Sequence, residues 1–323
     1  MINLKNFKLI ITMLAISIMV LSLVFSGCTL GVNNHTISPT PILASPTVTQ
    51  PLLTPTLTSS PTESPEIPET LPPYDRMNMG SAGTLTGNVV LINIFLSDEE
   101  SYLNDEERQE VMDRLDEMAE WFYYQIEKYD KELNIIYNLD DLSIDYHSDS
   151  ILIPRPGAGS EYDSTWGFDV MYEVYTSYDI GSLLERYNAD NYAFIMHINK
   201  PGRSYAQPIS YEYRDWFAYK YGELTPEFCV IFNRNRLTLR ETVPHTYAHE
   251  VLHLFGAIDL YYPNNPLDER FQLALEYAPD EIMRRLHDDI SRNTISNLTA
   301  YLIGWTDHLE ERYKVFIEEY KLG

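Results

Sequence analysis

The sequence predicts a mixed α/β domain, of the α+β class, over residues 80–323. Runs rich in Val, Ile and Leu at residues 88–96 and 228–232 are typical of buried β-strands. Apolar side chains recur every three or four residues along 105–129, which predicts one long amphipathic helix. The length of the region suits one good-sized domain. We therefore expect a twisted mixed sheet backed by a long helix.

The N-terminal residues 1–27 have the pattern of a secretory signal peptide. Lys5 and Lys8 supply positive charge, and an uncharged apolar run follows over residues 9–25. This run is short for a membrane span, although an uncleaved signal anchor is the alternative. It leads to Cys28 through Phe-Ser-Gly-Cys, which resembles a bacterial lipobox with Phe where Leu is usual. The resemblance implies export and a lipid on Cys28 that anchors the chain to the outer face of the cytoplasmic membrane.

Residues 28–79 form a segment rich in Pro, Thr and Ser. Ten of the nineteen prolines of the chain lie between Pro39 and Pro73. Such a composition buries too little apolar surface to fold, and its prolines keep the chain extended. We therefore expect a disordered tether between the anchor and the domain that begins at residue 80.

The charge and the cysteines restrict the classes of partner. The formal net charge of −25 argues against nucleic acid or an anionic lipid surface as a binding partner. Cys28 and Cys229 are the two cysteines of the chain, so lipidation of Cys28 leaves no intramolecular disulfide. Cys229 lies in the apolar run 228–232 and is expected to be a buried thiol. We expect a monomer.

In the first half of the domain, the strand 88–96 precedes the helix 105–129. The apolar stripe of this helix consists of Val111, Leu115, Met118, Phe122, Ile126 and Tyr129. A second strand is expected over residues 133–137. Residues 140–149 contain several aspartates, which makes a calcium loop conceivable, but the Gly and Glu of an EF-hand are absent.

In the second half, short helices are expected over residues 166–175 and 179–187, followed by a strand over 192–198. Towards the C-terminus, residues 297–305 lead into a closing helix over 306–321, whose apolar positions are expected to pack on the core. These elements predict a mostly helical C-terminal lobe.

One stretch in the second half of the chain reads H-E-x-x-H-x-x-G-x-x-D. In a helix, His249 and His253 stand one turn apart on the same face, close enough to share one metal ion. Gly256 suits the left-handed conformation that ends a helix, and the turn brings Asp259 back towards the histidines as a third ligand. Glu250 stands beside His249, where its carboxylate can take a proton from a metal-activated water.

This order of residues resembles the metzincin clan of zinc peptidases, and the final Asp is similar to the snapalysin-type members of the clan. The resemblance implies a metzincin-like catalytic domain in which His249, His253 and Asp259 hold one Zn²⁺ per chain on an active-site helix. It implies Glu250 as the general base. It also implies a methionine turn beneath the metal, for which Met283 in the sequence Ile-Met is the candidate.

Many metzincins carry a tyrosine two residues after that methionine, where it can reach the metal. Arg285 occupies this position here. A tyrosine with such a role would have to come from elsewhere in the chain, and Tyr261 and Tyr262 are the candidates.

Other assignments stay open. In a thermolysin-like arrangement the third ligand is a glutamate on a later helix, here Glu269 or Glu276, although the usual preceding Asn is missing. His197 could face a cleft from its strand, but a structural role is expected. His245, one turn before His249, suits a side chain that orients a ligand. The motif histidines could instead be core residues bonded to carbonyl groups.

The function expected from this pattern is that of a cell-surface zinc endopeptidase acting on a peptide or protein substrate. A lipoprotein binding module that keeps a zinc site without hydrolysis is the alternative from another class. Glu250 favours hydrolysis, because a structural zinc site needs no carboxylate beside its ligands. A hydrolase of non-peptide, cell-wall amides is the nearest enzymatic alternative.

Overall fold

The structure is a computed structural model that describes most of the expected domain. The described residues are 80–148, 165–209, 226–235, 237–261 and 269–318. The expected signal peptide and tether lie outside them, as do Cys28 and Tyr262. None of the helices in the described part of the chain is long and apolar enough to cross a membrane.

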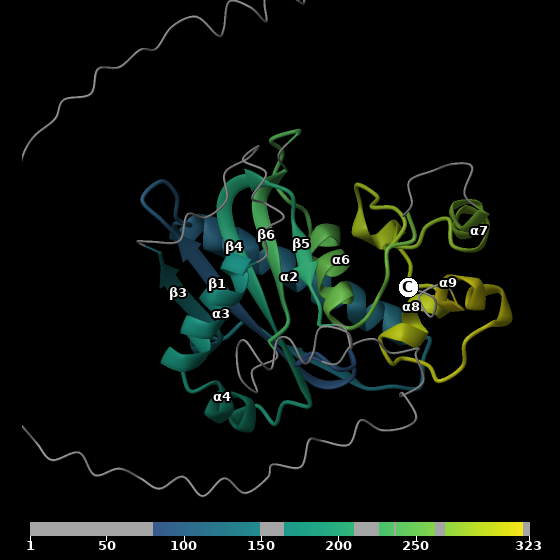
Figure 1. Ribbon diagram of the computed structural model, residues 1–323, viewed down its shortest axis with the longest axis horizontal. Coiled ribbons are helices and arrows are strands. Elements are labelled where there is room, and N and C mark those ends of the chain that lie inside the picture. Colours follow the sequence, from purple (N-terminus) through teal and green to yellow (C-terminus); the bar gives the residue numbers. More distant parts are fainter. Residues whose placement is uncertain (1–79, 149–164, 210–225, 236, 262–268, 319–323) are drawn as a thin grey trace, which may run out of the picture. The chain divides into compact units, whose positions relative to one another are not determined.

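The centre of the domain is a six-stranded sheet in the order β2-β1-β4-β6-β5, with β3 also paired to β1 (Figure 1). The strands are β1 (Gly87–Ser97), β2 (Leu133–Ile136), β3 (Ser143–His147), β4 (Asn191–Gly202), β5 (Tyr205–Gln207) and β6 (Phe228–Asn235). β2 pairs with the first part of β1 and β3 with its last part, both parallel. β4 and β6 continue the parallel pairing, whereas the edge strand β5 is antiparallel to β6. The sheet is therefore mixed, as the sequence predicts.

The helices complete the mixed α/β architecture. They are α2 (Asp105–Ile126), α3 (Thr165–Ser177), α4 (Ile180–Arg186), α6 (Pro244–Leu254), α7 (Glu269–Tyr277), α8 (Asn297–Leu302) and α9 (Lys314–Glu318). Three short 3₁₀ turns are η1 (Asp140–Leu142), η3 (Ile290–Arg292) and η4 (Glu311–Tyr313). The elements that follow β6 are helical, apart from their connecting turns, and confirm the expected helical C-terminal part (Figure 1).

Alternating side chains of the central strands fill two separate cores. Val89 and Leu91 of β1 belong to the core that α2 and α6 cover. Val90 and Ile92 belong to the core on the opposite face, which α3 and α4 cover. A parallel strand with both faces buried needs a nearly continuous apolar run rather than a polar alternation, which is why residues 89–96 are apolar apart from the buried Asn93.

The long helix α2 begins through a capping box. The side chain of Asn104 accepts a hydrogen bond from the amide of Glu107, and the Glu107 carboxylate accepts one from the amide of Asn104, both at 3.0 Å. This exchange satisfies two amides that a helix start would leave unpaired. Buried Leu115 and Phe122 lie on the side of α2 that packs against the sheet and α6.

Two segments differ from the expectations. The aspartate-rich segment forms η1 and the strand β3, in which Leu142 and Ile144 are buried and Asp145 is exposed and paired with Arg108. A 3₁₀ turn and a strand, for which no element was predicted, therefore occupy the described part of this segment. The edge strand β5 was not expected either. Its three residues are too few to leave a periodic pattern.

The prediction that the closing helix over residues 306–321 starts at residue 306 is wrong. The side chain of Asn297 donates a hydrogen bond to the carbonyl oxygen of His308 at 3.0 Å and accepts one from the amide of Glu310 at 2.7 Å. These bonds hold the backbone of Glu310 extended, so the first turn begins at η4 and α9 starts only at Lys314.

The beginning and the end of the described domain are joined at the entrance to β1. The amide of Leu85 donates to the carbonyl oxygen of Ile303 at 2.9 Å, and the indole of Trp305 donates to the carbonyl oxygen of Leu85 at 2.7 Å. Trp305 is 1% exposed and packs edge-on against Phe122 of α2. The last helices thus close the core beneath α2 and α6.

Candidate metal centre

The helix α6 presents the motif histidines from a buried position. It begins at Pro244, whose fixed φ suits the first helical turn, after the extended residue Val243. Tyr247, Val251 and Leu252 are fully buried and fix the helix against the sheet and α2. Because most sides of this helix are packed, the direction of its polar side chains is set by the core around it.

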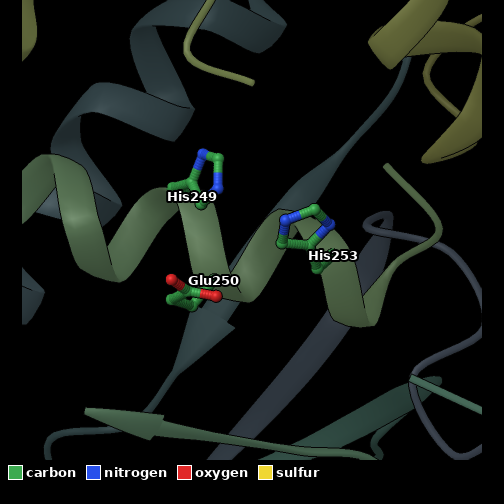
Figure 2. A group of neighbouring side chains, drawn as sticks. All are labelled: His249, Glu250 and His253. Carbon is green, nitrogen blue, oxygen red and sulfur yellow. The ribbon is translucent and has the colours of Figure 1, made fainter. Parts of the chain in front are cut away.

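His249 and His253 lie side by side on this helix. Their ring centroids are 4.8 Å apart and their planes are nearly perpendicular, at 89°. Figure 2 shows the two rings one helical turn apart, with the carboxylate of Glu250 projecting from the same helix. One ligand atom from each of these three side chains lies within 4.8 Å of the others.

Backbone carbonyls hold both imidazoles through the same nitrogen. Nδ1 of His249 lies 3.1 Å from the carbonyl oxygen of Ile282, and Nδ1 of His253 lies 2.8 Å from that of Ala257. A carbonyl only accepts hydrogen bonds, so each Nδ1 must carry the proton. In the neutral rings the Nε2 atoms therefore carry the lone pairs, which are available to bind a metal. A carbonyl hydrogen bond at Nδ1 is the usual arrangement of a metal-binding histidine.

Asp259 meets both of these Nε2 atoms. Its Oδ1 lies 3.3 Å from Nε2 of His249 and 3.1 Å from Nε2 of His253. The chain returns because α6 ends at Leu254 and Gly256 adopts φ of 97°, a left-handed conformation that glycine tolerates best. The turn expected from the sequence is thus present, and it brings the three expected ligands together.

The contact of Asp259 with the histidines changes the acidity of both partners. Burial would raise the pKa of Asp259, but the two imidazoles hold that pKa well below its usual range. Burial would likewise lower the pKa of His253, but the Asp259 carboxylate outweighs it and raises that pKa. The carboxylate therefore stays ionised and available as a ligand.

The donor set fits a metal ion. When a metal displaces the Nε2 protons, the two imidazoles with protonated Nδ1 and the ionised carboxylate offer three lone pairs at neighbouring atoms. The buried Oδ1 atom of Asp259 accepts no well-directed hydrogen bond, as expected if the facing Nε2 atoms carry no proton. Oδ1 of Asp259 lies within 3.3 Å of both Nε2 atoms, and electron-rich atoms this close repel unless a cation lies among them. Nitrogen and oxygen donors of this kind suit Zn²⁺.

Glu250 is buried beside this point. Burial raises the pKa of its carboxyl group above the usual value, and the two histidines act in the opposite direction. A carboxylate in such a setting is a stronger base than a solvated one. Glu250 can therefore take up a proton next to the metal-binding atoms.

A turn that includes Ile282 and Met283 forms backbone hydrogen bonds with the candidate site. Ile282 supplies the carbonyl that holds His249, and the amide of Leu260 donates to the carbonyl oxygen of Met283 at 2.9 Å. The Met283 side chain is fully buried in the core that contains α6. The backbone of Ile282 and Met283 therefore contacts the His249 ring and the residue that follows Asp259, while a methionine turn beneath a metal stays a prediction.

Tyr261 is the candidate tyrosine that the structure describes. Its ring lies 6.2 Å from that of His249, with an angle of 22° between their planes. Burial, followed by the nearby Asp259 carboxylate, raises the pKa of its hydroxyl to about 12. The hydroxyl is therefore a hydrogen-bond donor in the neutral pH range, beside the metal-binding atoms.

The rival third ligands do not approach the histidines. Glu269 and Glu276 lie on α7, both are exposed, and neither lines the cavity around the histidines. His197 is buried, stacks on Phe95 at 5.0 Å, and its Nε2 lies 2.9 Å from Oδ1 of Asn93. This histidine is part of the core, as expected for a structural residue.

His245 lines the cavity without joining the ligands. Burial lowers its pKa to about 4, which keeps the ring neutral. It lies one turn before His249, but the described group of potential ligand atoms contains His249, Glu250 and His253 and not His245.

An open cavity of about 1030 Å³ gives access to the site. It runs between α6, the strand β5 and the turn after Ile282, and His249, Glu250, His253 and Asp259 line it. Its rim also carries arginines, at positions 203, 240, 284 and 285, that the motif does not indicate. The sequence Pro-Gly-Arg-Ser around Arg203 predicts a turn after a strand, where side chains are exposed. The other three arginines have no such local signal.

Neither the protein-family models nor the curated proteins that were compared with the chain give a match. The geometry of the site is therefore the basis for the functional argument that follows.

Proposed function

We propose that this chain is a zinc-dependent endopeptidase. The observation that carries the proposal is the convergence of three donor atoms, Nε2 of His249, Nε2 of His253 and Oδ1 of Asp259, at one wall of an open cavity. The order of these residues resembles that of metzincins, which adds support from the sequence. The cavity has a volume of about 1030 Å³ and is open to solvent, so a substrate can reach the donor atoms.

The reaction follows from the residues around the donors. Zn²⁺ bound by this set would polarise the scissile carbonyl group and lower the pKa of a water molecule. Glu250 accepts the proton of that water as its oxygen attacks the carbonyl carbon. The same carboxyl group then donates the proton to the leaving nitrogen, and the C–N bond breaks. The neutral hydroxyl of Tyr261 is a donor for the negative charge that develops on the carbonyl oxygen.

We place the enzyme outside the cytoplasmic membrane. The apolar segment 9–25 and the lipobox-like sequence before Cys28 support export and lipid anchoring. The Pro- and Thr-rich residues 28–79 would then hold the domain away from the bilayer, where protein substrates can reach it. The partners of this arrangement are a peptide or protein substrate and the membrane that carries the lipid.

The test compares the full-length wild-type protein with the variants Glu250→Gln and His249→Ala. Elemental analysis is expected to give one zinc per wild-type and per Glu250→Gln chain, and little zinc in His249→Ala. A peptide library digested with each protein should show cleavage by the wild type alone. Turnover by Glu250→Gln should fall by about 10²- to 10⁴-fold, because an amide cannot take up the proton.

The same preparation distinguishes the alternatives. A zinc-loaded wild type that cleaves neither peptides nor cell-wall amides would indicate a binding module. Release of cell-wall fragments without peptide cleavage would indicate the amide hydrolase. Glu250→Gln with wild-type turnover would exclude Glu250 as the base.

A further inference from the structure

The charged residues around the cavity differ in sign from the chain as a whole. Outside the metal-binding group, four arginines line the cavity: Arg203, Arg240, Arg284 and Arg285. Among the described residues outside the metal-binding group, Glu241 and Asp288 are the carboxylates that line it with them. The whole chain has a formal net charge of −25, so an excess of positive charge at this cavity is a local feature.

The carboxylates of the rim do not neutralise this excess. Glu241 already pairs with Arg114 of α2, with Oε2 at 3.0 Å from the guanidinium nitrogen Nη2. Asp288 lies close enough to His245 to oppose the lowering of its pKa by burial. In the described part of the chain, neither carboxylate forms an ion pair with an arginine of the cavity.

Arg240 and Arg285 make no ion pair within the described residues, and both are exposed. Other arginines of the same residues do pair with carboxylates, among them Arg108 with Asp145 and Arg186 with Asp141. In so acidic a chain, two cationic side chains without a carboxylate partner at one cavity leave positive potential there.

Arg203 lies close enough to Glu250 and Tyr261 for its charge to act on both. It belongs to the turn between β4 and β5. Arg284 is held in place, because its guanidinium group donates to the carbonyl oxygens of Ala278 and Pro279. The positive charge at the cavity wall therefore comes from two separate segments, the turn between β4 and β5 and the turn after Ile282.

We propose that the cavity selects acidic segments of polypeptide, with Asp or Glu close to the bond that is cut. This inference rests on the proposed peptidase function and names its substrate class. Guanidinium groups bind carboxylates through paired, charge-assisted hydrogen bonds, and a partly enclosed cavity strengthens such contacts over bulk water. Arg240 and Arg285 are the specificity-determining residues, because both are exposed and neither pairs with a carboxylate in the part of the chain that the structure describes.

The chain-wide negative charge repels acidic substrates at a distance. The preference is therefore a property of the cavity, and it has to be measured between matched peptides rather than as an absolute rate. Each peptide of a fluorogenic set carries Asp or Glu at one position on either side of the central bonds. Its partner carries Asn or Gln at that position and is otherwise identical.

The zinc-loaded full-length protein is expected to cleave the acidic members of some pairs with a kcat/KM at least about tenfold higher. The double variant Arg240→Gln/Arg285→Gln should bring this ratio close to one while it still cleaves the neutral peptides. Arg186→Gln removes the same charge from α4, on the opposite face of the sheet, and should keep the wild-type ratio. Equal cleavage of acidic and neutral members in every pair would overturn the inference and leave the peptidase function intact.

A binding measurement separates the inference from the peptidase function. The Glu250→Gln protein, loaded with zinc, is titrated with the labelled peptides and followed by fluorescence anisotropy. Tighter binding of acidic members, lost in the triple variant with Arg240→Gln and Arg285→Gln, supports the inference even if the wild type cuts nothing. Equal affinities for acidic and neutral members overturn it.

Discussion

Nδ1 of His249 lies 3.1 Å from the backbone carbonyl oxygen of Ile282, a residue that is remote in sequence. The next residue, Met283, accepts the amide of Leu260 at 2.9 Å, directly after Asp259. One turn of the chain therefore fixes the ring of one candidate ligand and the backbone beside another. The candidate metal centre and this turn form a single structural unit.

Asp259 and Glu276 can be separated as third ligands by zinc affinity. Asp259→Ala leaves two imidazoles for the metal and should weaken zinc binding by more than the 10- to 100-fold typical of residues outside the ligand shell. Asp259→His should lose less, because imidazole is also a zinc ligand. A competition titration with a chelating dye measures all three proteins.

Glu276→Ala is the matched control for this titration. Glu276 is exposed on α7, so its removal should leave zinc affinity unchanged. Loss of zinc from Glu276→Ala together with its retention in Asp259→Ala would contradict the assignment of Asp259.

Gly256→Ala tests the turn that returns the chain to the histidines. Gly256 has φ of 97°, where a Cβ atom costs about 1–2 kcal/mol of folding free energy. The variant should therefore be less stable by that amount in urea unfolding, and it should bind zinc more weakly because Asp259 is displaced. Gly181→Ala in α4 is the control. A Cβ there meets its nearest atom at 3.7 Å, so stability should stay equal or rise by up to about 1 kcal/mol.

Glu281 should make stability fall as the pH rises. Burial raises its pKa to about 7 from an ordinary value of 4.5, although hydrogen bonds from Ser296 and Thr299 act against this rise. Below pH 4.5 both the folded and the unfolded chain hold the proton. Between pH 4.5 and 7 the unfolded chain loses it first, so up to about 3 kcal/mol of stability is lost over this interval.

Urea unfolding at pH 5 and pH 8 measures this effect. Glu281→Gln cannot ionise, so its loss of stability between the two pH values should be smaller than that of the wild type. Glu276→Gln is the exposed control and should behave like the wild type. An identical loss in wild type and Glu281→Gln would refute the raised pKa.

The proposed anchor depends on Cys28. The wild-type protein should partition into the detergent phase of a Triton X-114 extraction, because an acyl chain adds apolar surface that water excludes. Cys28→Ser should remain in its unprocessed form and lack the lipid, as intact mass spectrometry would show. A wild-type protein recovered entirely from the aqueous phase would contradict the anchor.

The regular elements were predictable where local pattern and burial agree. The apolar run of β1 and the three-four spacing of α2 are local signals, and both elements lie within a few residues of the expected bounds. In β3 the signal was present as well, because Leu142, Ile144 and Tyr146 alternate with polar residues. No strand was nevertheless predicted for this segment, because its aspartates drew attention to a conceivable calcium loop. The late start of α9 depends on Asn297, a partner outside that helix, so the sequence of the helix does not indicate it.

In the candidate site, too, the features that follow from local sequence were predictable and those that depend on distant segments were not. The positions of His249 and His253 follow from the period of one helix, and the return of Asp259 follows from a glycine at the end of that helix. The carbonyl of Ile282 and the arginines of the cavity come from distant segments. No local period records such contacts, because they depend on how the sheet, α6 and the C-terminal turns pack together.

The hydrogen bond from Trp305 to Leu85 joins residues 220 positions apart. Protein synthesis begins at the N-terminus, so the entrance to β1 can close only after the 220 residues that follow Leu85 have been made. The carbonyl of Ile282 is also among the later parts to be made. A nascent chain that ends before Ile282 contains both motif histidines and the Ala257 carbonyl that holds His253, but it lacks the carbonyl that holds His249. The two candidate ligand rings are therefore fixed at different times during synthesis.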